Sequence, residues 1–168
     1  MDQMIEETRA TTTQLLQKIR GDLLREIELA GPGAAIMVCK YSAMENASAL
    51  ARSSGWSVSR VSLKPRNPTT GTPDAWEQTV LAEFERRAAS GEKAESLEEA
   101  RIVKEPMGRY FRYMKALPVQ PVCLSCHGPQ ESLTNAVKQR LLTEYPHDRA
   151  TGYQLGQVRG AVSIKRPL

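Results

Sequence analysis

Hydrophobic positions recur with helical spacing over the first third of the chain. Residues 3–30 carry Ile and Leu side chains three and four positions apart, between Asp2 and the helix-ending Gly31-Pro32-Gly33. We therefore expect one long amphipathic helix there. Residues 34–53 repeat the pattern with Cys39 on the apolar face, which predicts a second helix that turns Cys39 inward.

Patterns further along predict a sheet and two more helices. Alternating apolar positions predict strands over 56–63, 101–105, 109–119 and 157–164. Helical spacing predicts helices over 74–89 and 132–145, whereas 64–73 has the proline and glycine content of a loop and 90–100 is polar and expected to be exposed. This order of elements is typical of an α+β domain with a small antiparallel sheet.

Composition limits the class of protein. The chain has 168 residues, enough for one ordinary domain, with 40% hydrophobic and 25% charged residues, which are globular values. Aromatic residues make up only 5%, so a large flat cofactor would supply apolar bulk that the core lacks. The net charge of +4 comes from Lys and Arg interspersed with Glu, without the aromatic-flanked basic clusters of nucleic-acid binding.

The segment Cys123-Leu124-Ser125-Cys126-His127 is a CxxCH motif. In c-type haem attachment this spacing lets both thiols reach the vinyl groups of one porphyrin, with the histidine as proximal iron ligand. A zinc site would need further ligands, and only Cys39 and His147 remain, while a redox dithiol usually accompanies a thioredoxin-like βαβ order. The motif therefore predicts one covalent haem c, with Gly128 allowing close backbone approach beside it.

The second axial ligand is not fixed by spacing. Its candidates are Cys39, His147, Met37, Met44, Met107 and Met114. Each has an ordinary structural interpretation: methionine as core filler, histidine at the surface, cysteine simply buried. Cys39 is favoured because an exported protein gains little from a spare thiol, and ferric iron would hold it as thiolate.

Three segments resemble a family of single-haem c-type domains with a PAS-like fold, long catalogued as a domain of unknown function. They are residues 35–40, residues 62–68 with 73–77, and residues 123–128. The family includes free periplasmic or thylakoid-lumen proteins and sensor modules of histidine kinases and chemoreceptors. In this chain residues 69–72 lengthen a link that is shorter in the family.

The resemblance implies a PAS-like antiparallel sheet with flanking helices over 31–168, preceded by the helix over 1–30. It also implies His127 and Cys39 as axial ligands. Arg66 and Asn67 are candidates for contacts to the haem propionates or edge, although they could merely close a turn. Tyr113, with Tyr110, is a candidate pocket residue, with ordinary core packing as the other interpretation.

These features favour a redox or diatomic-gas sensor that binds NO or CO at ferrous haem and acts on an unidentified redox or signalling partner. The other hypothesis is a small monohaem electron-transfer cytochrome, and no enzyme activity is expected. The N-terminal helix could pack on its own domain or form a homodimer. Haem is attached to CxxCH outside the bacterial cytoplasm, so we expect a periplasmic protein whose precursor carried a signal peptide or anchor.

Overall fold

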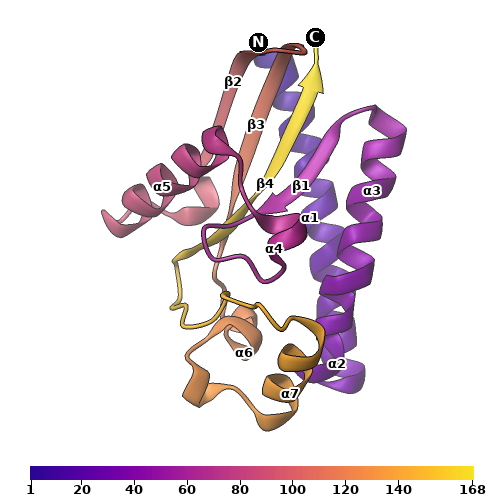
Figure 1. Ribbon diagram of the computed structural model, residues 1–168, viewed down its shortest axis with the longest axis vertical. Coiled ribbons are helices and arrows are strands. Elements are labelled where there is room, and N and C mark those ends of the chain that lie inside the picture. The colour runs from indigo at the N-terminus through magenta and orange to yellow at the C-terminus, as the bar shows by residue number, and fades with distance from the viewer.

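A four-stranded antiparallel sheet with order β1-β4-β3-β2 forms the centre of the computed structural model, which describes residues 1–168 (Figure 1). The strands are β1 (Ser57–Val61), β2 (Glu98–Glu105), β3 (Gly108–Pro118) and β4 (Val158–Pro167). The helices are α1 (Asp2–Ala30), α2 (Pro32–Met37), α3 (Ala43–Ser54), α4 (Pro68–Gly71), α5 (Ala75–Ala89), α6 (Leu124–His127) and α7 (Asn135–Glu144). The α+β class with an antiparallel sheet, flanking helices and a long N-terminal helix is confirmed.

The long helix α1 packs on one face of its own sheet. Phe111 and Tyr113 of β3 and Ile164 of β4 are fully buried there, with Met4 and Leu16 of α1 packed against them. Phe111 and Tyr113 are two positions apart on one strand and Ile164 is the cross-strand partner of Tyr113, so all three side chains lie on one face of the sheet. Of the two packing arrangements considered for this helix, the structure shows the one on its own domain, and Leu24 and Leu29 stay exposed.

The opposite face of the sheet is covered by α5. Leu81 and Phe84 are 1% exposed and pack on Met114, whose strand parity is opposite to that of Tyr113. The helix begins with a capping box in which Asp74 and Glu77 bond each other's backbone N–H groups.

The segment expected to be exposed, 90–100, is only partly so. Ala94 and Leu97 are buried in the cluster beneath α5, because a 3-10 turn over Ala94–Ser96 folds them inward. Strand β2 also begins at Glu98, within this segment, which corrects the expected start at residue 101.

The second predicted helix is continuous over 32–54 but not uniform. It consists of α2, a π-helical segment Val38–Ser42 that contains Cys39, and α3. Ser42 donates a hydrogen bond to Asp22 of α1 at 2.9 Å, which fixes the π-helical segment against the long helix. Gly55 ends α3 in the left-handed conformation, with φ 71°.

A lobe of short helices lies below the sheet in Figure 1, formed by α6 and α7. Ile36 of α2 packs on Val137 and Leu141 of α7, so this lobe is joined to the helices that carry Cys39. Helix α7 begins later than expected because Thr134 caps it, accepting a hydrogen bond from the Val137 N–H at 3.3 Å. No helix in the fold combines the length and apolar character needed to span a bilayer.

Candidate functional site

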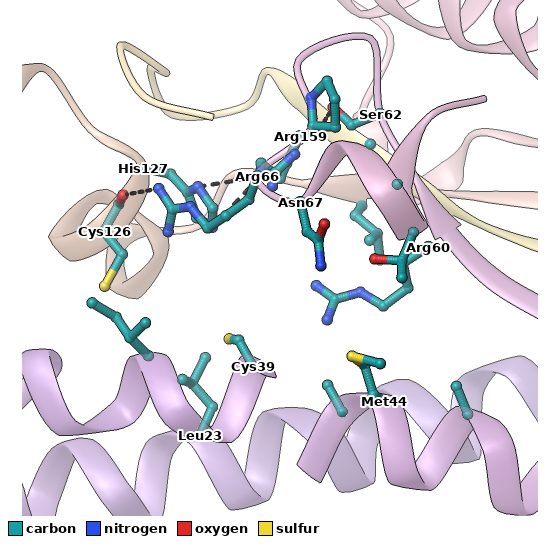
Figure 2. Close-up of a pocket in the computed structure, with 18 of the residues that line it drawn as sticks. Leu23, Cys39, Met44, Arg60, Ser62, Arg66, Asn67, Cys126, His127 and Arg159 are labelled. Carbon is teal, nitrogen blue, oxygen red and sulfur yellow. Dashed lines mark hydrogen bonds between the residues drawn. The ribbon is translucent and has the colours of Figure 1, made fainter. Parts of the chain in front are cut away.

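A cavity of about 290 Å³ opens where the lower end of the sheet, the Cys39-bearing helices and the α6 lobe meet (Figure 2). More than half of the residues that line it are hydrophobic. Cys39, Cys123, Cys126 and His127 all line this one cavity, and the three cysteines are free thiols. Burial raises the pKa of Cys126 to about 11, so its thiol is protonated at neutral pH.

His127 is held by the backbone of a distant loop. Its Nδ1 lies 2.7 Å from the carbonyl oxygen of Ala150, and because a carbonyl can only accept, Nδ1 carries the proton. Burial, reinforced by Arg159 and Arg66, lowers the pKa of His127 well below its ordinary value, so the ring is neutral. A neutral ring with Nδ1 protonated leaves the lone pair of Nε2 for a metal.

Arg159 of β4 lies against the same ring. Its Nε is 3.1 Å from Nδ1 and 3.5 Å from Nε2 of His127, so it lies against the face of the ring and not in line with either nitrogen's lone pair. Its Nη1 also lies 3.4 Å from the carbonyl oxygen of Lys64. Both contacts are with neutral groups.

Arg66 fastens the CxxCH segment to the loop that holds His127. Its Nη2 lies 3.1 Å from Asp148, and it donates to the carbonyl oxygens of Cys126 at 2.6 Å and Ala150 at 3.0 Å. Asn67 lines the cavity and also caps α4, where its side chain accepts from the Thr69 N–H at 3.1 Å. Both residues therefore border the cavity, and both also organise the local backbone.

Tyr113 does not line the cavity, contrary to expectation. It is fully buried on the sheet face covered by α1, and its hydroxyl donates to Glu98 at 2.9 Å. Tyr110 is also absent from the cavity wall and lies under the ammonium group of Lys165. Successive residues of a strand point to opposite faces of the sheet, and only the packed fold shows which face each tyrosine lies on.

The candidates for a second axial ligand differ in whether they line the cavity. Cys39 and Met44 line the cavity, and Met44 is 49% exposed at its mouth. Met114 is buried beneath α5, Met107 is 87% exposed in a turn, and neither Met37 nor His147 lines the cavity. Figure 2 shows Cys39 on the helical side of the cavity, with His127 on the opposite side.

Gly128 is required by the local backbone. A Cβ at this position would lie 2.6 Å from the carbonyl oxygen of Leu124, so the glycine is required by the tight α6 turn itself. Arg60 of β1 and Arg159 of β4 also line the cavity, and they were not among the residues predicted from sequence. Alternation in the predicted strands was the only available signal, and it assigns charged residues to solvent.

Comparison with known proteins identifies a solved structure with a similar fold. A structure described as the crystal structure of the cyanobacterial heme-protein Tll0287 matches with a TM-score of 0.70 and 23% sequence identity, covering 96% of this chain and 95% of that chain. No curated protein sequence matches. The family described as Tll0287-like matches residues 1–167. Because that match spans nearly the whole sequence, the chain belongs to the Tll0287-like family.

Proposed function

We propose that this protein binds one covalent haem c, attached through Cys123 and Cys126, with His127 and Cys39 as axial ligands. The observation that carries the proposal is that Cys39, far away in the sequence, lines the same largely apolar cavity as the three side chains of the CxxCH motif. Membership of the Tll0287-like family supports haem binding, because the similar cyanobacterial structure is described as a heme-protein.

The residues of the cavity fit this group. The bond from Nδ1 of His127 to Ala150 orients the ring and keeps Nε2 unprotonated, as a metal-bound imidazole requires. Cys39 lies across the cavity and supplies a sulfur ligand, which as thiolate favours ferric iron. Haem, when bound, supplies an iron that changes oxidation state and takes NO or CO where a ligand position is open.

Absorption and electron paramagnetic resonance (EPR) spectroscopy of the purified full chain test the ligand set. Covalent attachment predicts a haemochrome that stays with the protein in acid acetone and is lost in the Cys123→Ala, Cys126→Ala double variant. A low-spin ferric thiolate signal should be present and should vanish in Cys39→Ala, while Met44→Leu, at the other candidate position, leaves it unchanged. A spectrum without the thiolate signal that changes in Met44→Leu and not in Cys39→Ala would assign the ligand to the Met44 thioether.

We further propose a sensor role, with the π-helical segment as the responsive element. Lys40 in this segment pairs with Glu144 of α7 at 2.6 Å, and Ser42 bonds Asp22 of α1. Displacement of Cys39 would therefore pull on both α1 and α7, which is how a local change becomes a signal. If reduction with dithionite lets the protein bind CO, and hydrogen exchange in α1 rises with it, this role is supported.

A plain electron carrier is the competing proposal, and exposure of Met44 at the cavity mouth favours it, because electron transfer needs access to the cofactor. A carrier keeps both ligands in both oxidation states. A reduced protein that takes no CO and shows unchanged hydrogen exchange in α1 would support the carrier and contradict the sensor.

We propose a non-enzymatic role, because the lining of the cavity includes no Asp, Glu or second His that could serve as a catalytic acid or base beside the iron. Export to the periplasm is proposed because haem c is attached outside the bacterial cytoplasm.

A homodimer through α1 is a further proposal, because Leu24 and Leu29 of this helix are exposed. Sedimentation of the full chain beside a Leu24→Glu, Leu29→Glu variant tests it, and a monomer in both would remove the idea.

A further inference from the structure

Two arginines in the cavity wall lack an acidic partner. The Nε of Arg60 is buried without a hydrogen-bond partner, and its side chain forms no ion pair. The side chain of Arg159 contacts the carbonyl of Lys64 and the rings of His127 and Tyr153, and it forms no ion pair. Arg66, which lines the same cavity, differs because Asp148 balances its charge. Guanidinium groups partly enclosed by an apolar cavity wall without a counter-charge are costly, so Arg60 and Arg159 point to an anionic ligand.

The contact between Arg159 and His127 does not balance the charge of the guanidinium. The Nε of Arg159 lies 3.1 Å from Nδ1 and 3.5 Å from Nε2, so it rests against the face of the ring and not in line with the Nε2 lone pair. A neutral ring supplies no counter-charge, so Arg159 needs another acceptor. An arginine guanidinium keeps its charge at neutral pH.

We propose that Arg60 and Arg159 bind the two propionate carboxylates of the haem. The inference rests on the proposed function and adds the residues that orient the porphyrin. Guanidinium and carboxylate groups form short, charge-assisted and often bidentate hydrogen bonds. Haem carries two carboxylates, and the cavity wall presents two guanidinium groups without acidic partners.

The placement of these residues matches the asymmetry of the porphyrin. Its vinyl groups, which the thiols attach, lie at the edge away from the propionates. Figure 2 shows Cys126 and Arg60 at opposite sides of the cavity, with His127 and Cys39 facing each other between them. Attachment at the Cys126 side therefore turns the carboxylate edge toward the ends of β1 and β4.

The test compares ferric haemin with its dimethyl ester, which lacks the carboxylate charges. The full chain carries Cys123→Ala and Cys126→Ala so that binding is reversible and can be titrated by absorbance. A charged hydrogen bond is typically worth a factor of about 10 to 150 in affinity, so the parent should prefer haemin over the ester by at least about tenfold. Arg60→Gln and Arg159→Gln should each reduce this preference, and together should reduce it to about threefold or less.

Matched variants separate charge from folding. Arg101→Gln removes a cation from β2 whose side chain is 66% exposed and distant from the cavity lining, and it should leave the preference unchanged. Arg60→Lys and Arg159→Lys keep the charge and should retain part of the preference. Arg60→Gln removes no hydrogen bond present in this structure and removes an unbalanced charge, so the variant should unfold at or above the temperature of the parent.

A parent that binds haemin and its ester equally, or an Arg60→Gln variant with the parental preference, would overturn the inference. The haemochrome of the unsubstituted protein would then still stand, so the proposed function would survive. Loss of both haemin binding and the haemochrome would instead refute the proposed function itself.

Discussion

Replacing Arg66 with alanine would remove its ion pair with Asp148 and the hydrogen bonds by which it joins the CxxCH segment to the loop that binds His127. The side chains of Arg66 and Asp148 are 10% and 11% exposed. Breaking such a buried pair costs about 3–5 kcal/mol, because the remaining charge stays buried without its partner. Asp148 would still accept from the Ala150 N–H at 2.7 Å, so we expect the lower end, about 3 kcal/mol.

Urea unfolding of the unloaded full chain measures this loss directly. For a chain of this size, a loss of about 3 kcal/mol corresponds to a fall of about 6–12 °C in the unfolding temperature. Arg86→Ala is the matched control, because Arg86 pairs with Glu83 at a similar distance, 2.6 Å, but with side chains 67% and 48% exposed. Such an exposed pair contributes less than about 1 kcal/mol.

A conservative variant and a double-mutant cycle make the test specific. Arg66→Lys keeps the charge but not the planar fork that reaches Asp148 and two carbonyl oxygens, so it should recover less than half of the loss. Arg66→Ala and Asp148→Asn should be strongly non-additive, because they remove the same pair. If Arg66→Ala costs no more than the Arg86→Ala control, this account of the buried pair is wrong.

Further outcomes concern the α1 contact and two glycines. The hydrogen bond from Arg9 holds the pKa of Glu98 below its ordinary value despite partial burial. Because this pKa is lower in the folded state, its stabilisation is present above about pH 4.3 and is lost as pH falls through the folded-state pKa. Glu98→Gln should therefore lower the free energy of unfolding at neutral pH, and the fall in that free energy on acidification should be smaller than in the parent. Urea unfolding at several pH values measures both, and an unchanged pH profile would contradict this account. A Cβ on Gly160 would lie 2.4 Å from the Val61 carbonyl oxygen, so Gly160→Ala should cost about 1–3 kcal/mol in thermal unfolding. Gly21→Ala, in α1 with nothing within 4 Å of the added Cβ, should instead stabilise by about 0.5–1 kcal/mol, and equal effects of the two would refute the contrast.

The elements with strong local signals were predictable from sequence. Helix α5 has both a clear apolar period and a capping box, and its predicted range differs from the structure only at its first residue. Helix α7 starts later than predicted because the Thr134 cap sets its first turn. The burial of Leu97 was missed because the packing of a short turn, and not a periodic pattern, brings it under α5.

The site was predictable only where its residues are close in sequence. Spacing in the motif 123–127 fixes which side chains lie together, since the whole segment is one turn of 3-10 and α-helix. Arg60 and Arg159 come from different strands and reach the same cavity only through the pairing of β1 with β4. From sequence alone, a charged residue in an alternating strand is assigned to the solvent-facing side of the sheet. Only the packed structure shows that this end of the sheet is covered.

The π-helical segment explains why the Cys39 region could be predicted as a helix but not in its detailed form. The apolar period through Cys39 and Ala43 suits an ordinary helix, whereas the structure shows an i→i+5 bond from the Ala43 N–H to the Val38 carbonyl. Such widened turns are rare overall, but they are often found at functional sites. A local irregularity of this kind persists where the surrounding contacts hold it in place. Contacts of Lys40 with α7 and of Ser42 with α1 fulfil that condition. The turn that presents Cys39 thus depends on contacts with α1 and α7, which the local sequence around Cys39 does not contain.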